Sequence, residues 1–475
     1  MGLEPAVQTQ LYQDYWRPME VDFGQEAYET DFDSFMRYYL IVKTGDMPKY
    51  GEVYEAFKSY CPPETLASDV KVAVEDIRRF SSHYCAIALD AESKLELKLA
   101  FRDLRELKMD VAMPLLLELY DDYVSGTLQL EDFIETVRLM ESYVFRRAVC
   151  SIPTNSLNKT FATFGRYLKK DRYLESIKAH FLLLPSYRRF PSDEEFKRDL
   201  QVRDLYNFRN RSYWLRRMEN HNRKERVQVA DYTIEHILPQ NEDLPAPWKE
   251  ELGPNWKEIQ DTYVHTLGNL TLTGYNSEYS DRPYHEKCDM PGGFRESPLR
   301  LNHGLGQLEH WNEEAIRNRA EQLSDIALDV WRSPTLDPEI LEAYKQRPTV
   351  SGTYAIEDHP TLLRSPSKEL FQAFRQKVLE LDPCVTEEFL KLYVAYKAES
   401  NFVDVVPQSK GLRLFLNMRF IDIDDPKGYC RDVSGVGRWG NGDVEVFLRT
   451  HEDLPYVMRL VRQSFESQIR DGEDL

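Results

Sequence analysis

The sequence predicts an α+β fold that is mainly helical, and three patterns along the chain indicate it. Apolar residues recur at spacings of three and four through residues 31–220, as in Phe32 and Phe35, which is typical of amphipathic helices. Two short stretches of β-compatible residues follow within 227–287. From 365 to 466, strand-like segments lie between two helical ones, so the chain should end in a small α+β domain.

These patterns divide the chain into four segments, and its 475 residues suffice for two or three domains at roughly 150 residues each. Residues 1–226 should form a helical domain of about eight or nine helices. Residues 227–332 should form a unit of two strands and a helix (ββα), with another helix behind it. Residues 333–364, with scattered prolines, should form a linker, and residues 365–475 the closing α+β domain.

The strands and helices of the last two domains can be placed more closely. In the ββα unit, residues 232–234 and 270–273 are the expected strands, and an insertion bearing Pro and Trp separates them at 245–256. In the closing domain we expect helices at 368–381 and 453–468, and strands at 392–395, 402–406, 412–417 and 444–448.

The net charge of -19 limits how the protein can bind nucleic acid, because contacts with phosphate need clustered Lys and Arg. Any DNA contact should therefore be local. The best candidate is the stretch 203–226, which holds eight basic and three acidic residues and includes Arg216 and Arg217. A basic helix face exposed to solvent explains the same composition equally well.

Cysteine usage and hydropathy indicate the compartment. The six cysteines are scattered singly, without a CxxC pair for structural zinc or redox chemistry. No run of about eighteen apolar residues is present, and the first 33 residues lack the basic and apolar regions of a signal peptide. We expect a cytoplasmic protein with reduced thiols and no membrane segment.

Residues that can carry chemistry gather in the ββα unit, where five of the ten histidines lie between 236 and 310. The string EHILPQ begins at Glu235, and HTLGNLTL begins at His265. Asn276 and Lys287 follow. Hydrolysis of a phosphodiester needs an activated water and a cation near the scissile oxygens.

An acid next to a histidine can supply both needs. Glu235 offers a hard oxygen ligand for Mg²⁺ or Mn²⁺, and His236 can act as the general base that removes a proton from water. Neighbours within a regular strand point to opposite faces, so this pair should sit at a strand end, where Pro239 is placed to stop the strand.

Further residues complete the predicted site. Asn269 should orient the His236 ring by a hydrogen bond, and the amide oxygen of Asn276 should be a second metal ligand. Contacts with the DNA phosphates are expected from Lys287, His265 and Arg282, and from Arg216 and Arg217 in the basic stretch.

Each of these residues also has a purely structural interpretation. His236 fits a buried imidazole bonded to backbone groups, and Glu235 a surface carboxylate. Asn269 fits a turn cap beside Gly268, and Asn276 a helix cap. Lys287 fits a solvent-exposed side chain.

The ordered motifs resemble the HNH nuclease domain at the C-terminal end of GmrSD-type, modification-dependent restriction endonucleases. The string LYQDYWRPME at 11–20 and the helical region are also similar to that family. FVDVVP at 402–407 and GVGRWGNGD at 435–443 resemble an accessory domain often appended to it. The resemblance covers most of the chain. It implies a metal-dependent HNH endonuclease of a prokaryotic anti-phage restriction system, which cuts modified phage DNA and leaves 5′-phosphate and 3′-hydroxyl ends.

The sequence departs from that family in two places. It lacks the DGQQR-like nucleotide-handling motif, so an NTP-hydrolysing partner would be a domain or subunit absent from this chain. Asn276 stands where many HNH enzymes have histidine. Two other functions stay open: a non-catalytic DNA-binding or scaffold subunit, and an RNase.

Overall fold

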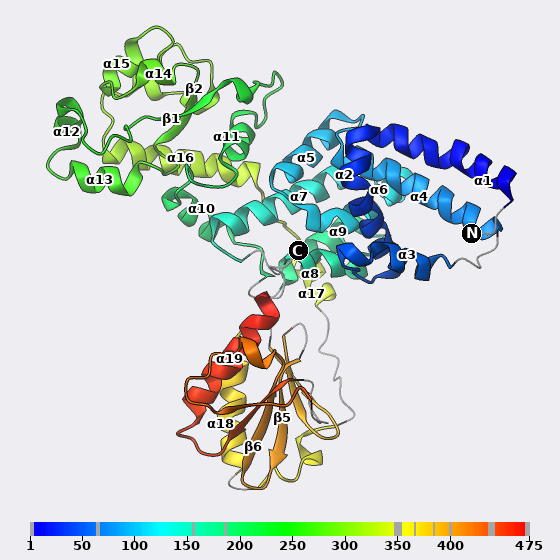
Figure 1. Ribbon diagram of the computed structural model, residues 1–475. Helices are drawn as coiled ribbons and strands as arrows, with labels where there is room; N and C mark the ends of the chain where they lie inside the picture. The colour runs from blue at the N-terminus through cyan, green and yellow to red at the C-terminus, as the bar shows by residue number, and fades with distance from the viewer. Residues whose placement is uncertain are drawn as a thin grey trace. The chain divides into compact units, whose positions relative to one another are not determined.

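The computed structural model describes residues 4–62, 67–153, 157–184, 188–345, 354–364, 367–382, 385–398, 401–435 and 442–470. The chain forms two compact units (Figure 1). The first comprises Met1–Ile152, Phe161–Leu182 and Phe190–Leu336, and the second comprises Pro153–Thr160, Leu183–Arg189 and Asp337–Leu475. The expected mainly helical α+β class is confirmed. None of the helices in the described ranges combines the length and apolar character needed to cross a bilayer.

As far as residue 202, the regular secondary structure of the described residues is helical. They are α1 Pro5–Leu11, α2 Arg17–Thr44, α3 Val53–Tyr60, α4 Ala67–Ala88, α5 Leu95–Glu106, α6 Met113–Val124, α7 Leu130–Val149, α8 Leu157–Phe164, α9 Tyr173–Leu183 and α10 Asp193–Val202, with a π-helix at Tyr12–Trp16 between α1 and α2. In α7, Phe133, Val137, Met140 and Val144 follow helical spacing and are all buried, as the sequence pattern predicts.

The remainder of the first unit holds a two-stranded antiparallel sheet among short helices. Its elements are α11 Arg211–Glu219, β1 Thr233–His236, α12 Ala246–Leu252, α13 Trp256–Tyr263, β2 Leu270–Thr273, α14 Asn276–Tyr279, α15 Tyr284–Asp289 and α16 Glu313–Val330. The register pairs Thr233 with Thr273 and His236 with Leu270. The second strand has the predicted bounds, whereas the first runs over 233–236 instead of the expected 232–234 and ends three residues before Pro239.

Helix α16 is bonded to the turn that leads into β2 of the hairpin formed by β1 and β2. The guanidinium of its buried Arg319 donates to the carbonyl oxygens of Leu267, Gly268 and Leu270 at 2.7–3.2 Å, so it satisfies the turn that leads into β2. Asn312 caps the helix by accepting from the Ala315 N–H. These bonds fix the backbone of the turn that leads into β2.

The second unit contains a six-stranded antiparallel sheet in the order β3-β4-β5-β6-β8-β7. Its elements are α17 Pro338–Tyr344, α18 Ser367–Leu379, β3 Thr386–Phe389, β4 Val394–Lys397, β5 Asn401–Gln408, β6 Gly411–Leu416, β7 Cys430–Asp432, β8 Val444–Leu448 and α19 Leu454–Arg470. Helices α18 and α19 lie along the sheet in Figure 1 and share an apolar core with it, which includes Phe371, Val403 and Leu414. Residues 436–441 of the string GVGRWGNGD lie outside the described residues.

Candidate active site

The end of β1 and the turn before β2 are joined by one amide side chain. Asn269 accepts the Leu238 N–H at 2.7 Å, and its Nδ2 donates to the carbonyl oxygens of Leu238 and Val264, both at 3.0 Å. The indole N–H of Trp311 donates to the same Asn269 oxygen at 3.2 Å. Both polar atoms of Asn269 are therefore engaged with other groups, and the expected bond to the His236 ring is corrected: Asn269 holds the chain that carries His236.

His236 lies at the last position of β1 and contacts two rings. Its Nε2 is 3.0 Å from Nδ1 of His265, and the Tyr206 ring meets it edge-on at 4.4 Å. Only 5% of the residue is exposed. Burial, together with the nearby charges of His265 and Lys287, lowers the pKa of His236 to about 3. The imidazole is therefore neutral at physiological pH, the form that can accept a proton.

Two residues of the loop between α10 and α11 fix His265. Tyr206 stacks on it with ring centroids 5.1 Å apart and planes at 11°, and the Leu205 N–H donates to the His265 carbonyl oxygen at 2.9 Å. The guanidinium of Arg211 lies 4.8 Å from the Tyr206 ring centre. The sequence analysis did not predict that Tyr206 belongs to this site. Its location in the basic stretch just before the motif is a signal that could have indicated it.

Glu235 forms a buried ion pair with Lys287. The Lys287 Nζ is 2.6 Å from Oε1 of Glu235 and also donates to the carbonyl oxygens of His236 and Ile237 at 3.2 Å. Burial raises the pKa of Glu235 to about 7, although Lys287 acts in the opposite direction. Lys287 has no exposed surface, so the expectation that it contacts phosphate or lies in solvent is corrected: it stabilises the acid and the end of β1.

Asn276 opens α14 and is tied to β1. Its Nδ2 donates to the Ile234 carbonyl oxygen at 2.8 Å, which leaves the amide oxygen of this half-buried side chain available. It makes no capping bond, since Tyr275 occupies the N-cap position. Arg282 is exposed, as a phosphate contact requires, and pairs with Glu286 at 3.1 Å.

Comparison with known proteins finds two family matches along the chain. Residues 190–326 match the family described as GmrSD restriction endonucleases, C-terminal domain. Residues 190–326 are therefore similar to that family, and we call them the GmrSD-type domain. Residues 358–468 match a domain of unknown function, DUF5655, so the expected resemblance is confirmed for residues 190–326 and for the appended domain. The family match supports a nuclease role in restriction.

A relative of the chain is an uncharacterized protein from Haemophilus influenzae. The two are 28% identical over 169 residues, which cover 31% of this chain and 56% of the relative. The chain therefore spans little more than half the length of that protein.

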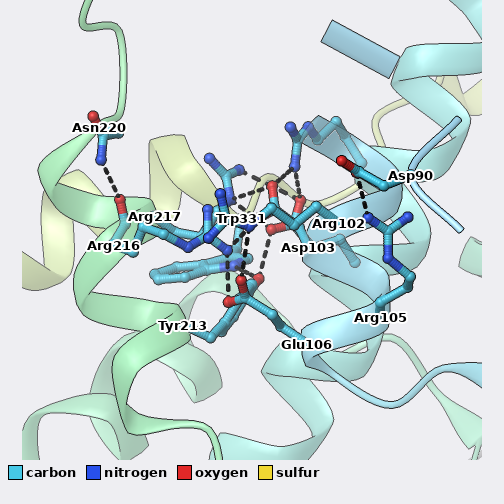
Figure 2. A network of polar contacts seen from close by, with 12 residues as sticks. Asp90, Arg102, Asp103, Arg105, Glu106, Tyr213, Arg216, Arg217, Asn220 and Trp331 are labelled. Carbon is cyan, nitrogen blue, oxygen red and sulfur yellow. Dashed lines mark hydrogen bonds and ion pairs between the residues drawn. The ribbon is translucent and has the colours of Figure 1, made fainter. Parts of the chain in front are cut away.

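Arg216 and Arg217 precede the GmrSD-type hairpin but do not face solvent. Figure 2 shows both within a network of ion pairs, in which Arg216 Nη2 lies 2.5 Å from Asp103 and 2.7 Å from Glu106. Arg217 Nε lies 2.6 Å from Oε1 of Glu141. The expectation that they bind DNA is corrected, because both guanidinium groups already neutralise buried carboxylates and join α11 to α5 and α7.

Metal ligands in the GmrSD-type domain were expected at Glu235 and Asn276. Within the described ranges, the one group of three His, Cys, Asp or Glu side chains close enough for a single ion is Cys150, Glu195 and Asp199, on α10 and at the end of α7. Glu235 is paired with Lys287 of α15, and Asn276 donates to the Ile234 carbonyl oxygen of β1. Both are hard oxygen donors, the chemistry that Mg²⁺ and Mn²⁺ prefer.

Proposed function

We propose that the GmrSD-type domain is a metal-dependent HNH endonuclease that hydrolyses DNA phosphodiesters, with His236 as its general base. The observation that carries the proposal is the placement of the His236 imidazole at the last position of β1, next in sequence to Glu235, on a strand end that Asn269 ties to the turn before β2. A neutral histidine with a free ring nitrogen can accept a proton from water.

The free nitrogen of His236 is Nδ1. Nε2 is bonded to His265, whereas Nδ1 has no hydrogen-bond partner within the described part of the chain. In the proposed reaction Nδ1 takes a proton from a water molecule, whose oxygen attacks phosphorus. The bond from phosphorus to the 3′ oxygen breaks, and that oxygen takes a proton from solvent. The products carry 5′-phosphate and 3′-hydroxyl ends.

The donor set fits a hard cation. The amide oxygen of Asn276 and Oε2 of Glu235 have no hydrogen-bond partners within the described residues, and together they would hold Mg²⁺ or Mn²⁺. The ion, when bound, would stabilise negative charge on the scissile phosphate oxygens. Lys287 holds the other oxygen of Glu235 and so fixes the orientation of the carboxylate.

The substrate and partner proposals rest on the family resemblance. The substrate would be modified phage DNA, and an NTP-hydrolysing domain or subunit beyond these residues would act with the chain. Arg282 and His265 are the proposed phosphate contacts that keep some exposed surface.

Cleavage assays test the proposal. The purified protein is incubated with unmodified plasmid, with DNA carrying modified bases and with RNA, each with Mg²⁺, Mn²⁺ or a chelator. We expect metal-dependent DNA cleavage that His236→Ala abolishes. His285→Ala, which changes an exposed histidine on α15, should keep the activity. DNA cleavage that survives His236→Ala would refute the assignment. Cleavage of RNA alone would favour an RNase, and DNA binding without cleavage a scaffold subunit.

A further inference from the structure

We infer that His265 is a positioning residue that holds His236 in the tautomer with its proton on Nε2, so that Nδ1 keeps the lone pair for catalysis. This inference rests on the proposed function of His236 as the base. It assigns His265 a role in addition to the phosphate contact suggested by its place in the motif.

The bond between the two rings allows two arrangements. Nε2 of His236 and Nδ1 of His265 are 3.0 Å apart, and one of them must donate a proton to the other. If His236 donates, its Nδ1 is unprotonated and can act as the base. If His265 donates, the lone pair on His236 Nε2 accepts the bond and its Nδ1 carries the proton, so neither nitrogen can accept a proton from water. Only the first arrangement is productive.

A nearby carboxylate favours the productive arrangement. Asp204 interacts electrostatically with both imidazoles. Burial opposes its ionisation, but hydrogen bonds from Asn207 at 2.8 and 2.9 Å, with His265 nearby, hold the pKa of Asp204 below its ordinary value. Because Nδ1 of His265 faces His236, a neutral His265 can offer a proton to this negative charge only from its outer nitrogen, Nε2, which leaves Nδ1 of His265 as the acceptor.

The surroundings of His265 keep its ring from turning away. Tyr206 stacks on its face, and the Leu205 N–H holds its backbone. Arg211 lies over the Tyr206 ring and donates to the Tyr206 carbonyl oxygen at 3.3 Å. The loop that carries Tyr206 is fixed in turn by the bonds from Asn207 to Asp204. These contacts restrict the position of the His265 ring, as expected of a residue that orients a neighbouring side chain by a hydrogen bond.

Substitutions that imitate one ring nitrogen at a time separate positioning from packing. In His265→Asn the amide lies near the position of Nδ1 and can accept from His236, whereas in His265→Gln it lies near the position of Nε2 and cannot. We expect His265→Gln and His265→Ala to lower kcat by about 10- to 100-fold. His265→Asn should recover most of the rate, and His285→Ala is the matched control on an exposed histidine.

A second readout does not depend on activity. In protein labelled with ¹⁵N in the histidine rings, the nitrogen chemical shifts report which ring nitrogen carries the proton. We expect Nε2 of His236 to be protonated in the wild type and in His265→Asn, and a mixture of tautomers in His265→Ala. A wild-type His236 protonated on Nδ1 would overturn the inference, and so would a His265→Ala variant with full activity. A wild type inactive with every metal would instead refute the proposed function, and the nitrogen shifts would still test the role of His265.

Discussion

At the residue scale, burial governs the two adjacent groups at the end of β1 in opposite directions. It raises the pKa of Glu235 to about 7 and lowers the pKa of His236 to about 3, because both shifts favour the uncharged form. The acid has a buried cation as its partner, whereas the side-chain contacts of the imidazole among the described residues are another imidazole and a phenol ring. Among these residues, therefore, no carboxylate is hydrogen-bonded to the neutral His236 ring.

The depressed pKa of His236 predicts its response to acid. An exposed imidazole titrates near pH 6.5, but the His236 resonances in an NMR titration should stay those of the neutral ring to about pH 4. Between pH 6.5 and 3 the unfolded state binds more protons than the folded state, so stability should fall as pH falls through this window. Urea unfolding of His236→Gln should show a smaller loss between pH 7 and 4.5. A midpoint near 6.5 for His236 would contradict the burial argument.

The Glu235–Lys287 pair predicts a stability effect. Lys287→Met removes one partner of a fully buried ion pair, and it should lower the free energy of unfolding by about 3 kcal/mol. Arg282→Met removes an exposed pair with Glu286 and should cost less than about 1 kcal/mol. Urea unfolding measures both. Unchanged stability with weakened DNA binding in Lys287→Met would instead support the phosphate contact predicted from the sequence.

The motif predicted the positions of Glu235 and His236 better than the side chains that contact them. The strand end was predicted close to its observed position at His236, because Pro239 and the strand pattern are local signals, but Glu235 lies one residue inside the strand and pairs with Thr271. The contacts of Lys287 with Glu235 and of His265 with His236 join residues far apart in the chain. Spacing along the sequence cannot show that the fold buries Lys287, or that Asn269 bonds to backbone instead of the imidazole.

At the element scale, an ion-pair network fixes α11, which leads into the hairpin. Glu141 of α7 lies at its centre and accepts from the Tyr213 hydroxyl at 2.5 Å and from Arg217 and Arg138 at 2.6 Å. Figure 2 shows the arginines of α11 meeting the acids of α5. The basic stretch therefore uses part of its charge inside the protein, which composition alone could not reveal.

Removal of the charge on Glu141 should weaken the ion pairs that hold α11 against α7. Burial opposes ionisation of Glu141, but Arg217 and Arg138 lower its pKa to about 2. The carboxylate therefore contributes stability above its unfolded pKa of 4.5, and this contribution is lost as pH falls toward 2. We expect Glu141→Gln to cost about 3 kcal/mol at pH 7 and to weaken the dependence of stability on pH between 4.5 and 2.

A control for this substitution lies on the same helix. Glu135 pairs with Lys178 at 2.6 Å, but its side chain is 47% exposed. Glu135→Gln should therefore change the free energy of unfolding by less than about 1 kcal/mol. Urea unfolding measures both variants. If Glu141→Gln and Glu135→Gln lowered the free energy of unfolding equally, burial of the ion-pair network would add nothing to stability.

The contact between α16 and the turn before β2 gives a further prediction. A Cβ added at Gly268 would lie 2.2 Å from the backbone oxygen of Ile316, which a helix cannot move aside cheaply. Gly268→Ala should therefore cost about 2 kcal/mol of stability. Gly274→Ala, at the other end of β2, meets no atom within 4 Å and should be nearly neutral. Thermal unfolding of the two variants measures the difference, and similar melting temperatures would refute the close approach.

At the scale of the whole molecule, the sequence predicted the class and most elements of the fold, and the two strands that it missed in the closing sheet share a cause. The edge strands β3 and β7 were missed because their residues, TEEF and CRD, are polar and partly exposed. An edge strand lacks the alternation that marks a strand with a buried face. The central strands β5, β6 and β8, with buried faces, were found within three residues of their ends.

The two compact units have separate apolar cores, so they should unfold in separate transitions. Phe371 of α18 is fully buried in the core of the second unit, and Phe371→Ala should destabilise that unit by about 3–5 kcal/mol. Calorimetry should then show one transition moved to lower temperature, with the other and the metal-dependent cleavage rate unchanged. Leu117→Ala, which changes a fully buried residue of α6 in the first unit, should move the other transition. A single transition that both substitutions shift together would mean that the units unfold cooperatively and that the appended domain stabilises the GmrSD-type domain.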